Sequence, residues 1–124
     1  MAKIEDPIAH LRKLCLAYPE AVEKPFGGHT APAFSIRDKM FAMTSGGGDG
    51  SSLSLWCKAP PGAQDVLVGS DPKRFFIPPY VGYKGWTAVH LDVPPINWSI
   101  VATIIDDSYR MTAPKHIVAQ LPPE

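Results

Sequence analysis

The stretch DPKRFFIPPYVGYKGW, residues 71–86, decides the fold of this chain. It places three cations, five aromatic residues, three prolines and two glycines in sixteen positions. The apolar segments 75–77 and 86–91 read as two strands, and Pro78-Pro79 is a stiff turn between them. Aromatic residues at this density usually enter a core, so we expect a structural role for Phe75, Phe76 and Trp86. The three cations are expected to face solvent: Lys73, Arg74 and Lys84.

Upstream of this stretch, the sequence predicts one helix followed by a meander of short strands. Asp6 before Pro7 is a helix start, apolar residues then recur at helical spacing, and Pro19 ends the helix after Tyr18. Four short β-like runs follow, separated by turn residues, at 22–26, 33–36, 39–44 and 52–58. The first is expected to be an edge strand, and Arg37-Asp38 joins the second and third as a hairpin.

Downstream, the sequence predicts more helix. Pro61 opens a short helix at 63–68, with Gly69 as the residue just past its end. Asn97 caps the longest helix, whose buried stripe is Trp98, Val101, Ala102, Ile105 and Tyr109. Asp106 and Arg110 lie one turn apart on its polar side and are expected to pair. Pro114 begins a last short helix.

This order of elements predicts the α+β class. Strands gathered in a meander, with helices at both ends, favour a two-layer sandwich in which helices pack on one face of an antiparallel sheet. We expect one domain over residues 1–124, since the chain has no linker and no internal repeat and its length suits a single core.

Composition narrows the class of protein further. Twelve basic residues balance twelve acidic ones, so any binding of anions must be local. Cys15 and Cys57 lie in apolar runs without a CxxC pairing, which is typical of reduced core thiols in a cytoplasmic protein. No apolar run approaches the roughly 18 residues that span a bilayer, so we expect a cytoplasmic protein without a membrane partner. The sequence says nothing about oligomeric state.

The motifs of catalysis and of metal binding are absent from the sequence. The glycines of 46–50 are not followed by GK[ST], so a phosphate loop is not indicated. The four histidines are scattered, which predicts no metal site, and no cofactor fingerprint is present. No G-x-S-x-G elbow accompanies a positioned base, so an enzyme is disfavoured. His29, in a polar turn before a strand, could donate to a ligand, although a local structural hydrogen bond explains this residue better.

A basic and aromatic constellation is the best signal for binding. It combines residues of the 71–86 stretch with residues at the junction of the last two helices: Arg74, Tyr80, Tyr83, Lys84 and Trp86 with Tyr109, Arg110, Lys115 and His116. If the two segments meet, they form a cationic ledge suited to phosphate or carboxylate oxygens. The alternative is that Arg74 pairs with a nearby carboxylate and Lys115 caps a helix.

Over nearly its full length the chain resembles the MmcQ/YjbR-like family. The resemblance is carried by residues 71–82 with Gly85-Trp86, and by 107–110 with 113–115. Shorter matches support it at Phe34, 39–42 and 53–57, and the family's histidine before a proline and an aromatic strand start is similar to His29, Pro32 and Phe34.

The resemblance implies a fold akin to the bacterial frataxin type, called double-wing, and a DNA-binding role. Iron is disfavoured because the acidic ridge of frataxin is not matched in the first helix. We therefore expect a DNA-binding module that contacts phosphates through Arg74, Lys84, Arg110 and Lys115. The alternative is a module that binds a protein or a small anionic ligand in a pocket between the sheet and the C-terminal helices.

Overall fold

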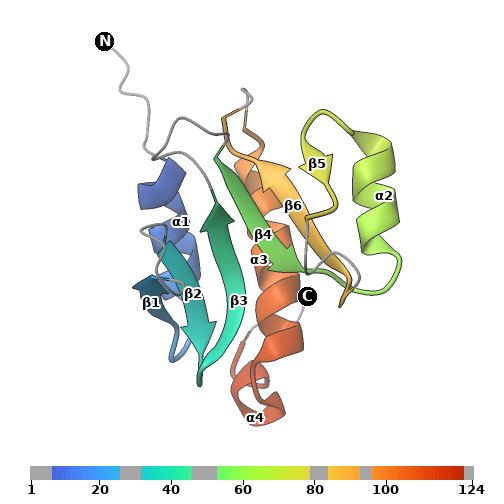
Figure 1. Cartoon of the computed structure of the whole chain (residues 1–124). Helices are drawn as coiled ribbons and strands as arrows, with labels where there is room; N and C mark the ends of the chain where they lie inside the picture. The colour runs from blue at the N-terminus through green and yellow to red at the C-terminus, as the bar shows by residue number, and fades with distance from the viewer. Residues whose placement is uncertain (1–6, 26–31, 46–52, 79–83, 93–95, 122–124) are drawn as a thin grey trace.

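The computed structural model describes residues 7–25, 32–45, 53–78, 84–92 and 96–121 of the 124-residue chain (Figure 1). The helices and strands in these ranges follow one another along the chain as α1 (Pro7–Leu16), β1 (Val22–Pro25), β2 (Pro32–Ile36), β3 (Lys39–Ser45), β4 (Ser54–Lys58), α2 (Ala63–Ser70), β5 (Phe75–Phe76), β6 (Trp86–His90), α3 (Trp98–Thr112) and α4 (Lys115–Val118). No helix within these ranges has the length and apolar character needed to cross a bilayer.

The described strands form one antiparallel sheet of six strands in the order β1-β2-β3-β4-β6-β5. Helices α1 and α3 lie behind the sheet, and α2 lies beyond the β5 edge (Figure 1). The predicted two-layer α+β sandwich is therefore confirmed, and β1 is an edge strand as expected. The turn of the β2–β3 hairpin places Arg37 and Asp38 at φ 49° and 65°, the left-handed conformations that a tight two-residue turn requires.

Alternation along the strands gives the sheet one face that packs on the helices and one face that the described helices leave uncovered. Phe34, Leu55 and Val89 point toward α1 and α3 and belong to the main core. Their neighbours on the same strands point the other way, toward what we call the open face, which no described helix covers. The open face carries, among others, Ala33, Met40, Met43, Ser54, Trp56, Lys58, Phe76, Trp86, Ala88 and His90.

Helix α3 is the central element of the helical layer. Asn97 caps it as predicted, its side-chain oxygen accepting from the Ile100 N–H at 3.2 Å. The buried stripe includes Val101, Ile105 and Tyr109, as predicted, and also Ile104, Ser108 and Thr112. Helix ends were predicted less accurately. Helix α1 stops at Leu16, two residues before the predicted end at Tyr18, and α2 continues to Ser70, so Gly69 lies inside the helix and Asp71 is its C-cap.

Ser108 joins the two layers of the fold. The β3–β4 ladder ends at Ala42 and Cys57, and the Ser108 hydroxyl bridges the next backbone groups. It donates to the Phe41 carbonyl at 2.5 Å and accepts from the Lys58 N–H at 3.0 Å, with its side chain fully buried. The hydroxyl therefore replaces a missing rung of the ladder and fixes α3 against the sheet.

Ser108→Ala should lower the free energy of unfolding by about 2 kcal/mol, because it leaves a backbone N–H and a backbone C=O without their partner. Urea denaturation measures the effect. The matched control is Ser99→Ala, an exposed serine on the same helix, which we expect to change stability by no more than about 0.5 kcal/mol. Equal effects of the two substitutions would show that Ser108 does not bridge the layers.

Thr87 contributes an unfavourable polar group to the core. It lies opposite Cys57 on the buried face of the sheet, is 1 % exposed, and its hydroxyl has no hydrogen-bond partner among the described residues. Thr87→Val keeps the shape and removes this hydroxyl, so it should raise the free energy of unfolding by about 1 kcal/mol. Thermal denaturation of the two proteins measures this gain, and a destabilised valine variant would mean that the hydroxyl has a partner.

Candidate functional site

Two of the arginines predicted to form one cationic ledge lie at opposite ends of α3. Arg74 lines a cavity together with Asn97 and Ile100, at the start of α3, whereas Arg110 is in its last turn. The ten residues from Ile100 to Arg110 correspond to about 15 Å along a helix. The structure therefore does not bring Arg74 and Arg110 together.

Each of these arginines also pairs with its own neighbouring acid. The Arg74 Nε lies 3.0 Å from Asp71 Oδ2, and the Arg110 Nε lies 2.8 Å from Asp106 Oδ2. Asp106 accepts a further hydrogen bond from the Tyr18 hydroxyl at 2.8 Å. The predicted Asp106–Arg110 pair is confirmed, and Arg110 belongs to a structural network between α3 and the segment that follows α1.

Tyr109 is a core residue and has no exposed surface. Its ring stacks on Tyr18 with centroids 4.5 Å apart and meets Phe41 edge-on at 5.2 Å. Its hydroxyl donates to the Pro19 carbonyl at 2.6 Å. Burial raises the pKa of Tyr109, so the phenol stays protonated. The sequence analysis placed Tyr109 both in the buried stripe of α3 and in the binding constellation. The buried position is confirmed, and Tyr109 therefore cannot be a ligand donor on the surface.

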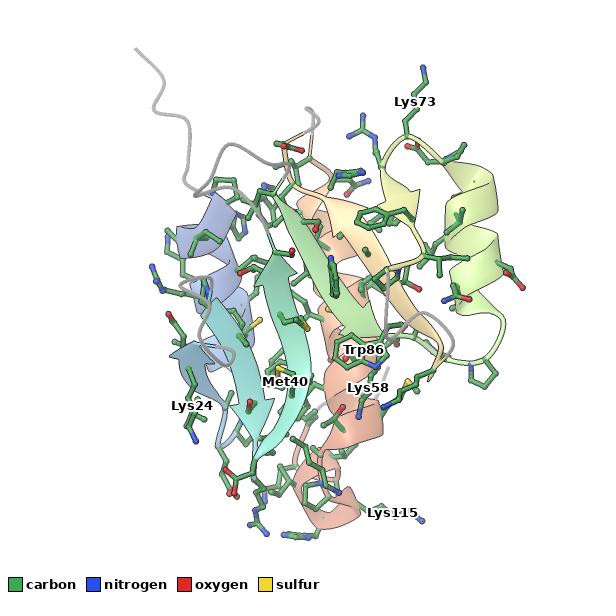
Figure 2. All side chains as sticks on the ribbon, in the orientation of Figure 1. Lys24, Met40, Lys58, Lys73, Trp86 and Lys115 are labelled. Atoms are coloured by element: carbon green, nitrogen blue, oxygen red, sulfur yellow. The ribbon has the colours of Figure 1, made fainter. Side chains whose placement is uncertain are left out.

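The remaining predicted residues divide into three groups. Tyr80, Tyr83 and His29 lie outside the described residues. Lys115 and His116 are exposed on α4, and Figure 2 shows Lys115 at the far end of the molecule from Lys73. Lys84 and Trp86, in contrast, lie at the open face, where they meet residues that the sequence analysis did not select.

Trp86 belongs to a small second core on the open face. It packs with Ala33 and Met43, and the side chains of Met40 and Trp56 complete the cluster (Figure 2). Trp86 is only 5 % exposed, which confirms its predicted structural role. Trp56 is half-buried, and its indole N–H donates to the Ser54 hydroxyl at 2.9 Å. The indole ring of Trp56 is thus held in one orientation on the face of the sheet.

Three lysines gather at one end of this aromatic cluster. Lys58 lies directly opposite Trp86 in the β4–β6 register, Lys84 precedes Trp86, and Lys39 begins the neighbouring strand β3. The β4–β6 pairing places Lys58 at the start of β6, and Lys39 is near enough for its charge to act on Lys58; we call Lys39, Lys58 and Lys84 the lysine cluster. Figure 2 shows Lys58 beside Trp86 on the open face.

The electrostatic environment of Lys58 is unfavourable for its charge. Partial burial lowers the pKa of Lys58, and the positive charges of Lys39 and Lys84 lower it further. Among the described residues, no carboxylate forms an ion pair with Lys58; Asp65 lines a hollow beside Lys84. A half-buried ammonium surrounded by like charges is stabilised when an anion binds next to it.

Neither thiol of the chain offers a nucleophile. Cys15 and Cys57 are free and fully buried, as predicted from the sequence. Burial raises the pKa of Cys15 to about 12 and raises that of Cys57 well above its usual value. Thiolates are therefore negligible at neutral pH. The described residues contain no group of three histidine, cysteine or acidic side chains placed to hold a metal ion.

The fold and the sequence both relate this chain to proteins already known. A crystal structure of the Deinococcus radiodurans protein DR2400, with a DUF419 domain, superposes on it with a TM-score of 0.75. The two are 21 % identical, and the match covers 88 % of this chain and 80 % of DR2400. No curated protein matches. The model of the YjbR family matches residues 16–111, most of the chain, and the protein therefore belongs to the YjbR family.

Proposed function

We propose that this protein binds single-stranded DNA on the open face of its sheet. The observation that carries the proposal is the environment of Lys58, a half-buried cation beside Lys39 and Lys84 and opposite Trp86. Phosphate oxygens beside Lys58 would place negative charge next to its half-buried ammonium group. The overall charge of zero does not oppose this, since the cations are gathered in one place.

Shape favours a single strand over a duplex. Reading a duplex in its major groove requires a projecting helix or a two-stranded ribbon, and no described helix lies on the open face. A sheet face with aromatic side chains instead suits unpaired bases, which stack on the rings while cations follow the backbone. The hydrogen bond to Ser54 holds the Trp56 ring in place for such stacking. Phe76 and His90 add two further rings on the same face, stacked on each other with centroids 4.6 Å apart.

The test is a titration of labelled oligonucleotides of about 12 nucleotides, followed by fluorescence anisotropy between about 50 and 200 mM salt. Three phosphate contacts on a single strand predict that the logarithm of the association constant falls with the logarithm of salt with a slope of about −2. Duplex DNA of the same length should bind more weakly. No binding at about 50 µM protein, or a slope near zero, would remove the proposal.

Trp56→Leu should weaken the binding of single strands by about 1 to 3 kcal/mol per stacked base, because leucine keeps the apolar contact but offers no ring. The salt slope should stay unchanged, since no cation is removed. The control is Trp98→Leu on the helical side of the sheet, where the ring stacks on His10 at 3.8 Å. A loss of affinity in the Trp98 variant alone would place the binding surface elsewhere.

A further inference from the structure

We propose that a cavity beside the start of α3 binds a small zwitterion with an apolar side chain, such as an apolar α-amino acid. The cavity has a volume of about 290 Å³ and lies between β5, β6 and the first turn of α3, with the end of α2 closing one side. The sequence analysis expected, as its alternative, a pocket between the sheet and the C-terminal helices, and this cavity lies between the sheet and α3. It lies at the other end of α3 from the lysine cluster, so the two proposals are independent.

The walls of the cavity are apolar. Phe75 and Val89, a cross-strand pair, form one wall, and Ile100 and Val101 of α3 form the opposite one. The volume would hold about ten water molecules at their liquid density, but apolar walls offer water few hydrogen bonds. An aliphatic or phenyl side chain fits this space and removes apolar surface from water.

The polar end of the cavity carries one charge of each sign. Asp71 and Arg74 both line it and pair with each other, Arg74 Nε to Asp71 Oδ2 at 3.0 Å. The backbone holds them in place: the N–H groups of Arg74 and Phe75 donate to the Asp71 carbonyl at 3.1 and 3.0 Å, and the Arg74 carbonyl accepts from the His90 N–H at 2.8 Å. The pair is therefore fixed before any ligand arrives.

Charge complementarity selects the ligand class. A simple carboxylate would compete with Asp71 for the Arg74 guanidinium, and a simple amine would compete with Arg74 for the Asp71 carboxylate. A zwitterion brings a partner for each, because its carboxylate extends the guanidinium's hydrogen bonds and its ammonium binds Asp71. The amide of Asn97 lines the same end and offers a donor, since its oxygen is already used in capping Ile100.

The test is thermal denaturation of the full chain with L-leucine or L-phenylalanine. At about ten times the dissociation constant, the amino acid should raise the melting temperature by about 4 °C. The matched probes are 4-methylpentanoate, which lacks the ammonium, and 3-methylbutylamine, which lacks the carboxylate; each should give less than a quarter of that shift. An equal shift with either one-charge probe, or no shift with any amino acid at about 10 mM, would overturn the proposal.

Variants of the polar pair separate this site from the open face. Arg74→Gln and Asp71→Asn should each weaken amino-acid binding at least tenfold while leaving the affinity for single-stranded DNA unchanged. If a variant is too unstable to titrate, methyl NMR of the wild-type protein gives the answer: saturating L-leucine should shift the signals of Val89, Ile100 and Val101. Shifts confined to other methyl groups would place the ligand elsewhere and refute the assignment.

Discussion

Replacing Lys39, Lys58 and Lys84 together by glutamine should lower the affinity for a single-stranded oligonucleotide about 100-fold at about 0.1 M salt. Each lysine is expected to neutralise one phosphate, so the salt slope of about −2 should fall to near zero. Fluorescence anisotropy across a salt series measures both quantities. The matched control replaces Lys13 of α1, Lys73 and Lys115, three exposed lysines outside the lysine cluster, and so removes the same charge.

The same triple variant should be more stable than the wild type. The pKa of Lys58 lies below its ordinary value of 10.5, so folding disfavours the protonated lysine. Because the shift is downward, this cost is fully present at neutral pH and disappears as the pH rises through the folded-state pKa. Removing the charge should add about 0.5 kcal/mol to the free energy of unfolding at low salt. A variant that loses both stability and binding would point to damaged folding instead of lost contacts.

Tyr109→Ala should cost about 3 to 5 kcal/mol of stability, a large part of what a domain of this size possesses. The ring fills the space between Tyr18 and Phe41, and its hydroxyl donates to the Pro19 carbonyl in the segment that follows α1. The substitution therefore opens a cavity and removes the contacts of α3 with Tyr18 and Pro19. Urea denaturation followed by circular dichroism measures the loss.

Tyr109→Phe isolates the hydroxyl from the ring in the same experiment. It keeps the packing and removes only the bond to Pro19, so the expected loss is about 1 kcal/mol. If alanine and phenylalanine cost the same, the ring does not carry the packing between the layers.

Local patterns in the sequence predicted most of the fold. The alternation of Leu53, Leu55 and Cys57 with Ser54 and Trp56 assigned both faces of β4 correctly, because side chains alternate strictly along a strand. The Asn97 cap and the Asp106–Arg110 pair depend on residues three and four apart, so the sequence shows them directly. The layer contact through Ser108 could not be predicted, because a serine on a helix resembles a solvated residue until its partners 50 and 67 residues away are known.

The candidate site was predicted less well, because it too depends on contacts between residues that are far apart in the sequence. Lys39, Lys58 and Lys84 are far apart in the sequence, and only the folded sheet brings the charges of Lys39 and Lys84 close to Lys58. Lys84 and Trp86 were selected because they belong to the stretch 71–86, whereas Lys58 and Lys39 were missed. Arg74 was selected with them, yet Asp71 stands three residues before it and pairs with it. Pairing 52–58 with 86–91 as antiparallel neighbours would have placed Lys58 opposite Trp86.

The most direct test of binding on the open face is the set of tryptophan indole N–H signals in a proton–nitrogen NMR spectrum. The chain has three tryptophans: Trp56 and Trp86 on the open face, and Trp98 on the helical side, stacked on His10. On addition of a saturating single-stranded oligonucleotide, the signals of Trp56 and Trp86 should shift while that of Trp98 stays in place. A shift of Trp98 alone, or three unchanged signals at saturation, would contradict binding on this face.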